Sequence, residues 1–248
     1  MDMILVNQLP VRTWNRLGVN ATALPWDQAA SRELEQTQVA AKAGGQETVH
    51  LSVQGEGEYS EKSVVVDAAE GSSVTVYEDL RSRQHLLVRT QMKVGPGAKV
   101  RLVQLLGTEQ DAVLRNEVSG TCQQEGSVEL LQVLLGRGDV YTDSRFVLKG
   151  DGSALTADMG YLGQARQVLD MNLVVDHYGK KTASRIDASG ALKDAAKKIF
   201  RGTIDFKTGS SDSAGSEQET VLMLGEDVVN KTVPLILCAE ENVAGNHG

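Results

Sequence analysis

The sequence predicts an all-β protein, built either as a parallel β-helix or as a β-sandwich. Three observations lead to this prediction. From about residue 48 onward, short runs rich in Val, Leu, Thr and Ile alternate with polar residues, a pattern typical of strands. Turn-forming residues separate these runs, and one phrase recurs at a nearly constant interval. The composition, 41% hydrophobic but only 4% aromatic, favours thin, regular layers over a bulky core.

The recurring phrase is a glycine, a small residue and then alternating apolar residues. It reads GSSVTV from residue 71, GAKVRL from 97, GSVELL from 126 and GSALTA from 152, at intervals of 26, 29 and 26 residues. Imperfect repetition at such a period indicates a solenoid whose coils bury their apolar faces against one another. A sandwich instead expects turn signals about every 8–12 residues, and Asp151–Gly152 is the sole Asn-Gly or Asp-Gly pair. Periodicity alone leaves both folds open.

Residues 1–45 are expected to form a lead-in to a β-helix core at 46–248. Residues 1–26 show neither helical nor strand periodicity, and they contain both tryptophans, Trp14 and Trp26. We expect this extended segment to dock its rings on the rest of the protein.

Two segments carry helical signals. A short helix is predicted near 27–42, because Asp27 suits an N-cap, Ala, Glu, Gln and Leu follow it, and Gly44–Gly45 would end it. The segment ALKDAAKKIF (191–200) also has helix formers at helical spacing. Tertiary context can override such a propensity.

Charge and cysteine usage exclude several protein classes. The net charge of −8 opposes binding of nucleic acid or of an anionic membrane. No run approaches the roughly 18 apolar residues of a membrane span, and the N-terminus lacks the pattern of a signal peptide. Cys122 and Cys238 match neither a zinc nor a redox spacing. The sequence therefore predicts a cytoplasmic protein with free thiols.

Known catalytic patterns are missing as well. The histidines His50, His85, His177 and His247 are far apart, so their spacing predicts no metal site. The sequence contains no Gly-x-Ser-x-Gly nucleophile and no phosphate-binding loop. No catalytic residue and no ATP binding are expected.

A solenoid carbohydrate-active enzyme is the alternative from another functional class. Such an enzyme would gather aspartates with Lys or Arg on one face. The candidates are spread along the chain: Asp170, Asp176, Asp187, Asp194 and Asp205. Whether the fold gathers them is left open by the sequence.

Two stretches carry a family resemblance: KKIFRGTIDFKTGS (197–210) and GEDVVNKTVPLILCAEENVAGNHG (225–248). They resemble the SufB/SufD family of iron–sulfur cluster assembly proteins, and PVRTWNRLGVN (10–20) resembles the lead-in of short SufD-like members. The resemblance implies a right-handed parallel β-helix. It also implies that residues 191–200 enter a rung of the helix and form no long α-helix.

The resemblance also implies partners. Members of the family pair as SufB with SufD, or with a second copy of themselves, and dock the SufC ATPase through a C-terminal helical tail. The nascent iron–sulfur cluster lies at a partner interface, and no cofactor is expected to bind tightly to this chain alone. Because the sequence stops at Gly248, we expect most of the ATPase-docking tail to be missing. A self-pairing homodimeric scaffold is a further hypothesis.

His247 is the leading candidate site residue. It falls on the family histidine implicated in cluster assembly, where a neutral imidazole could ligate iron. Glu219 stands where SufB-type members carry a scaffold cysteine, and Gly248 stands where they carry an acid. Both departures favour a non-catalytic, SufD-like subunit. Cys238 is a weaker candidate metal ligand, since a cysteine in an apolar strand is more often a core residue.

Overall fold

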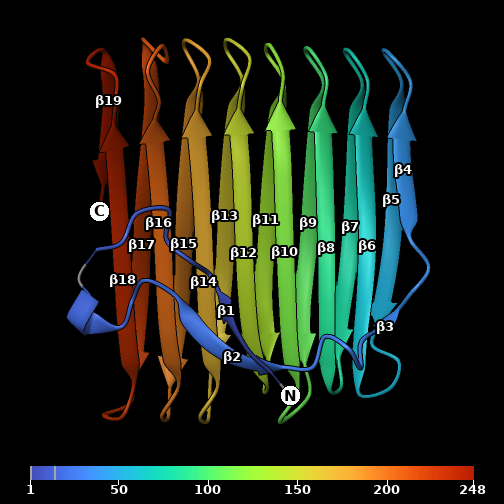
Figure 1. The fold of residues 1–248 in the computed structure, drawn as a ribbon, viewed down its shortest axis with the longest axis vertical. Helices are drawn as coiled ribbons and strands as arrows, with labels where there is room; N and C mark the ends of the chain where they lie inside the picture. The colour runs from blue at the N-terminus through green and yellow to red at the C-terminus, as the bar shows by residue number, and fades with distance from the viewer. Residues whose placement is uncertain (1, 14) are drawn as a thin grey trace.

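The protein is a parallel β-solenoid made of two long sheets that face each other (Figure 1). A computed structural model describes residues 2–13 and 15–248. Each coil contributes one strand to each sheet, so strands two apart in the chain are hydrogen-bonded neighbours. Every strand pair within these two sheets is parallel. This confirms the predicted β-helix and rules out the sandwich.

The strands divide regularly between the sheets. The first sheet contains β3 (Arg32–Glu33), β4 (Thr37–Ala41), β6 (Tyr59–Ala68), β8 (His85–Val94), β10 (Val113–Cys122), β12 (Asp139–Leu148), β14 (Val168–His177), β16 (Lys197–Phe206) and β18 (Val229–Cys238). The second sheet contains β5 (Gln46–Gln54), β7 (Ser73–Ser82), β9 (Lys99–Thr108), β11 (Ser127–Gly136), β13 (Ala154–Gly163), β15 (Ala183–Lys193), β17 (Ser213–Leu224) and β19 (Val243–His247).

The core lies between the sheets, because alternate residues of each strand point inward. The four copies of the glycine phrase lead into β7, β9, β11 and β13. Their first apolar residues, Val74, Val100, Val128 and Leu155, are in register and buried. The interval read from the sequence is therefore the length of one coil.

The helix predicted near 27–42 is wrong. Asp27 does accept a hydrogen bond from the Ala30 backbone N–H at 3.1 Å, as a cap would, but a turn follows instead of a helix. The segment then forms β3 and β4, which pair with β6. Val39 and Ala41 enter the core as a result. Burial and backbone pairing in the sheet outweigh the small helical preference of this stretch.

The segment 191–200 contains no helix, as the resemblance implied. It runs from the end of β15 through a turn into β16. Leu192, Ala196 and Phe200 are fully buried. These three residues are four apart, as in a helix, but Leu192 lies in β15, Ala196 in the turn and Phe200 in β16. Each points into the core for its own reason.

Residues 2–13 and 15–26, hereafter the lead-in, cross the outer face of the first sheet (Figure 1). The lead-in contains β1 (Asp2–Val6), the short 3-10 helix η1 (Asn15–Leu17) and β2 (Thr22–Trp26), and β1 and β2 form an antiparallel ribbon. Trp26 docks on Tyr59 with ring centroids 5.5 Å apart, as expected. The prediction for Trp14 lies outside the described residues. Within the described residues, no helix is long and apolar enough to cross a membrane.

Candidate functional site at the terminal coil

His247 lies on the last coil of the solenoid. This terminal coil consists of β18 and β19, and β19 pairs with Ser213–Glu217 of β17. His247 is in register with the buried, inward-facing Glu217, so it belongs to an inward-facing column. Its side chain is nevertheless exposed, because no further coil covers it in the described part of the chain.

Cys238 lies on the same coil but does not meet His247. The sequence expected Cys238 in the core, but it is exposed at the end of β18. It is in register with the buried Phe206 of β16, and no further strand covers it among the described residues. Gly245, two residues before His247, packs against Ile236, two residues before Cys238. The two candidate ligands therefore flank this contact on opposite sides. Among the described residues, no group of three or more His, Cys, Asp or Glu side chains is arranged to hold a metal ion.

Glu219 is the centre of a buried polar cluster beneath the terminal coil. Its carboxylate pairs with Lys198 of β16, and both side chains are nearly inaccessible to solvent. It also accepts hydrogen bonds from the Tyr161 hydroxyl at 2.9 Å and from Thr232 of β18. Burial lowers the pKa of the Lys198 ammonium, although Glu219 opposes this. Each oxygen of the Glu219 carboxylate is thus engaged by at least one partner.

Glu217 is the unpaired member of the same cluster. It is 3% exposed, and its Oε2 atom has no hydrogen-bond partner. The carboxyl group fills the space left by Gly202 on the facing strand, where a Cβ atom would overlap it. Burial raises the pKa of this carboxyl to about 7, and the neighbouring Glu219 adds to the rise while Lys198 opposes it. A buried acid without a partner is stable mainly in its neutral form.

Sequence reasoning missed Lys198, Glu217 and Tyr161. The sequence did contain a clue to Glu217, because Glu217 and Glu219 fall on the alternate positions of β17 that point inward. The alternation of β17 was not resolved from the sequence, since the run SAGSEQETVLML contains charged residues at inward positions. Tyr161 reaches the cluster because Gly190, its neighbour in register, leaves room for the ring.

The other histidines form no site together. His50 stacks on Tyr77 at 4.5 Å between ring centroids, on the second sheet. His85 stacks on Tyr59 beneath the lead-in. His177 is fully buried, and its ring nitrogens contact the hydroxyls of Thr182 and Ser184. Burial lowers the pKa of His177 to about 4, so this ring is neutral at physiological pH.

The five aspartates expected of a carbohydrate-active solenoid do not form one cluster. Asp170 is buried against Arg201, and Asp187 pairs with Arg185 on the other sheet. Asp176 and Asp205 are neighbours and share Lys207. Asp194 lies in a turn, where its carboxylate accepts the Ala165 N–H at 2.8 Å. This arrangement gives the carbohydrate-active alternative no support.

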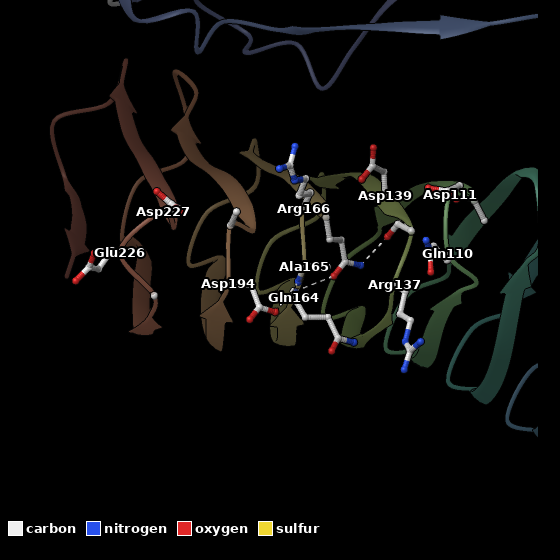
Figure 2. Close-up of a pocket in the computed structure, with 15 residues that line it drawn as sticks. Gln110, Asp111, Arg137, Asp139, Gln164, Ala165, Arg166, Asp194, Glu226 and Asp227 are labelled. Carbon is white, nitrogen blue, oxygen red and sulfur yellow. Dashed lines mark hydrogen bonds between the residues drawn. The ribbon is translucent and has the colours of Figure 1, made fainter.

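A groove follows a row of stacked turns along one edge of the solenoid (Figure 2). It has a volume of about 1170 Å³, and its carboxylates include Asp111, Asp139 and Asp194. Asp139 accepts the Val168 N–H at 2.8 Å, much as Asp194 accepts a backbone N–H from the next turn. Asp139 and Asp194 therefore tie the turns of neighbouring coils together.

Comparison with known proteins identifies the family. A sequence model described as "SUF system FeS cluster assembly, SufBD core domain" matches residues 50–248. The iron–sulfur cluster assembly protein SufD of Bacillus subtilis (strain 168) is 27% identical over 124 residues. The alignment covers 50% of this chain and 28% of that protein. The family match spans nearly the whole solenoid, including the terminal coil. The chain belongs to the SufBD core-domain family of the SUF iron–sulfur cluster assembly system.

Proposed function

We propose that the chain is a non-catalytic, SufD-like subunit of an iron–sulfur cluster assembly scaffold. It pairs through its terminal coil with a SufB-like protein, or with a second copy of itself. The assembly then couples to a SufC-like ATPase. The nascent cluster is the cargo of this scaffold and is held at the interface between subunits.

The match of residues 50–248 to the SufBD core-domain family carries this proposal. Exposed apolar residues at the end of β17 support a docking surface there. β19 pairs with Ser213–Glu217 only, and the Glu219 N–H bonds to the Gly248 carbonyl. Beyond that point, Thr220–Leu224 has no outer strand among the described residues. Leu222, Met223 and Leu224 there are 57%, 59% and 56% exposed. An apolar, unpaired edge is a template for a strand of another chain or segment.

The residues at this edge support a SufD-like division of roles. Glu219, at the position of the SufB cysteine, is already bonded by Lys198, Tyr161 and Thr232. It has little capacity left for a metal ion. His247, by contrast, is exposed on the adjacent strand. We therefore propose that a thiolate from the partner holds the cluster and that His247 contributes from this side.

Co-purification with SufB-like and SufC-like proteins from the same source tests the proposal. The edge variant is Leu222→Arg with Leu224→Arg, which adds charge where a partner strand would pack. Leu135→Arg is the matched control, because Leu135 is also exposed (45%) and lies on the second sheet, away from this edge. We expect the edge variant to lose the complex and the control to retain it. Equal binding by both variants would exclude the edge as the interface.

Iron and sulfide assayed anaerobically on the intact complex test the role of His247. We expect His247→Ala to retain the complex and to lose at least half of the bound iron. Unchanged iron would reduce the chain to a structural role. A tight homodimer with no SufB-like partner would favour the self-pairing scaffold.

A further inference from the structure

The lead-in contacts every full-length strand of the first sheet in turn. Trp26 lies against Tyr59 of β6 and His85 of β8, and the Arg115 guanidinium of β10 stacks on its ring at 4.8 Å. The Arg145 side chain of β12 donates to the Gln8 carbonyl at 2.9 Å. The remaining contacts are with β14, β16 and β18.

A buried ion pair anchors the lead-in to β14 and β16. Asp170 and Arg201 are fully buried and paired with each other. The Asn7 side chain donates to the Asp170 carboxylate at 2.7 Å, and Thr22 donates to its other oxygen. Arg201 donates from Nε to the Val19 carbonyl at 2.6 Å. Both side chains lie on the outward face of the sheet, so the lead-in both buries the ion pair and supplies its remaining hydrogen bonds.

The contact with β18 is the one that covers the terminal coil. Leu9 and Val19 form an apolar cluster with Val233, and the Lys231 ammonium donates to the Leu17 carbonyl at 3.2 Å. Within β18, all of which the structure describes, Val233 is the only buried residue, at 4% exposure. The core does not bury it, because its position in the strand faces outward, in register with Arg201. The lead-in buries it.

This arrangement differs from that of an ordinary solenoid. Coils in a solenoid contact only their neighbours, so the end coils fray first and opening at one end is not felt at the other. Here residues 2–13 and 15–26 run across the outer face of the first sheet and link β6 to β18 through contacts with each strand between them (Figure 1).

We propose that residues 2–13 and 15–26 form a strap that holds the terminal coil closed, with Leu9 and Val19 as its positioning residues on Val233. Order in the coil that carries His247 then depends on a segment more than 200 residues earlier in the chain. Because such coupling is reciprocal, a partner seated on the terminal coil would also tighten the strap. The inference concerns the chain alone and does not depend on the identity of any partner.

Hydrogen exchange on the whole chain, read by mass spectrometry, tests the strap. The test variant is Leu9→Ala with Val19→Ala, which shortens only strap residues and leaves the solenoid unchanged. The matched control is Leu24→Ala, because Leu24 is also a buried strap residue but packs in the cluster around Tyr59 and Tyr141. Peptides from Val229–Cys238 report on β18, and peptides from Val113–Cys122 report on the middle of the same sheet.

We expect the double variant to speed exchange in β18 at least tenfold, while β10 stays within twofold of the unmodified chain. Leu24→Ala should leave β18 within twofold. Unchanged β18 exchange, equal acceleration of all strands, or equal acceleration of β18 by the control would each overturn the proposal. If the double variant does not fold, Val19→Ala alone is measured, with an expected acceleration of at least threefold confined to β18. No such acceleration would equally overturn it.

Discussion

Replacing Glu217 with glutamine should make the protein more stable at alkaline pH. Glu217 is buried, lies against Gly202 and leaves one carboxyl oxygen without a partner. Its pKa is raised from 4.5 to about 7 in the folded chain, chiefly by burial. A glutamine side chain at this position would have nearly the same shape and would carry no charge at any pH.

The sign and size follow from proton linkage. Between pH 4.5 and 7 the folded chain binds a proton at Glu217 that the unfolded chain has lost, so stability falls as pH rises through this window. A difference of about 2.5 pH units corresponds to about 3 kcal/mol. We expect Glu217→Gln and the unmodified chain to be equally stable near pH 4, and the variant to be more stable by about 3 kcal/mol at pH 8.

The measurement is the difference in free energy of unfolding between the two proteins, from urea titrations followed by circular dichroism at several pH values. The difference is needed because His177 acts in the opposite direction. Its folded pKa of about 4 adds stability as pH rises towards 6.5, and this contribution cancels between the two proteins. A difference that does not change with pH, or a variant less stable at pH 8, would refute the reasoning.

Three further predictions concern buried groups. In the native state a thiol reagent should modify the exposed Cys238 and spare Cys122, whose thiol pKa burial raises to about 12; titration of two thiols without denaturant would contradict this. Gly202→Ala should destabilise the chain by about 1–3 kcal/mol in thermal unfolding, because its Cβ would overlap the carboxyl of Glu217. Combining it with Glu217→Ala should recover most of that loss, and additive losses would count against the overlap. Arg201→Met should cost about 3–5 kcal/mol in urea titrations, because it leaves a buried aspartate unpaired; a loss below about 1 kcal/mol would show that the ion pair is not anchoring the strap.

Sequence periodicity alone determined the coil length and the all-β class. Each copy of the glycine phrase, from GSSVTV at 71 to GSALTA at 152, marks one coil. The coil length can be read from the sequence because alternation and turn residues are local properties. Every coil buries one face of its strands and therefore carries the same local pattern. The same local signals misled at 27–42, where a weak helical preference was outweighed by pairing with β6. The choice between β-helix and sandwich needed the family resemblance.

Tertiary structure decided everything that depends on two distant segments meeting. The sequence pointed to His247 and Glu219, but it did not show that Lys198 and Tyr161 engage Glu219, or that Glu217 is buried beside Gly202. It also expected Cys238 in the core, since an apolar strand does not reveal whether another coil covers it. The path of the lead-in onto Val233 was equally hidden. Such contacts depend on register and on which face of a sheet is left uncovered, and neither is encoded in any single stretch of the chain.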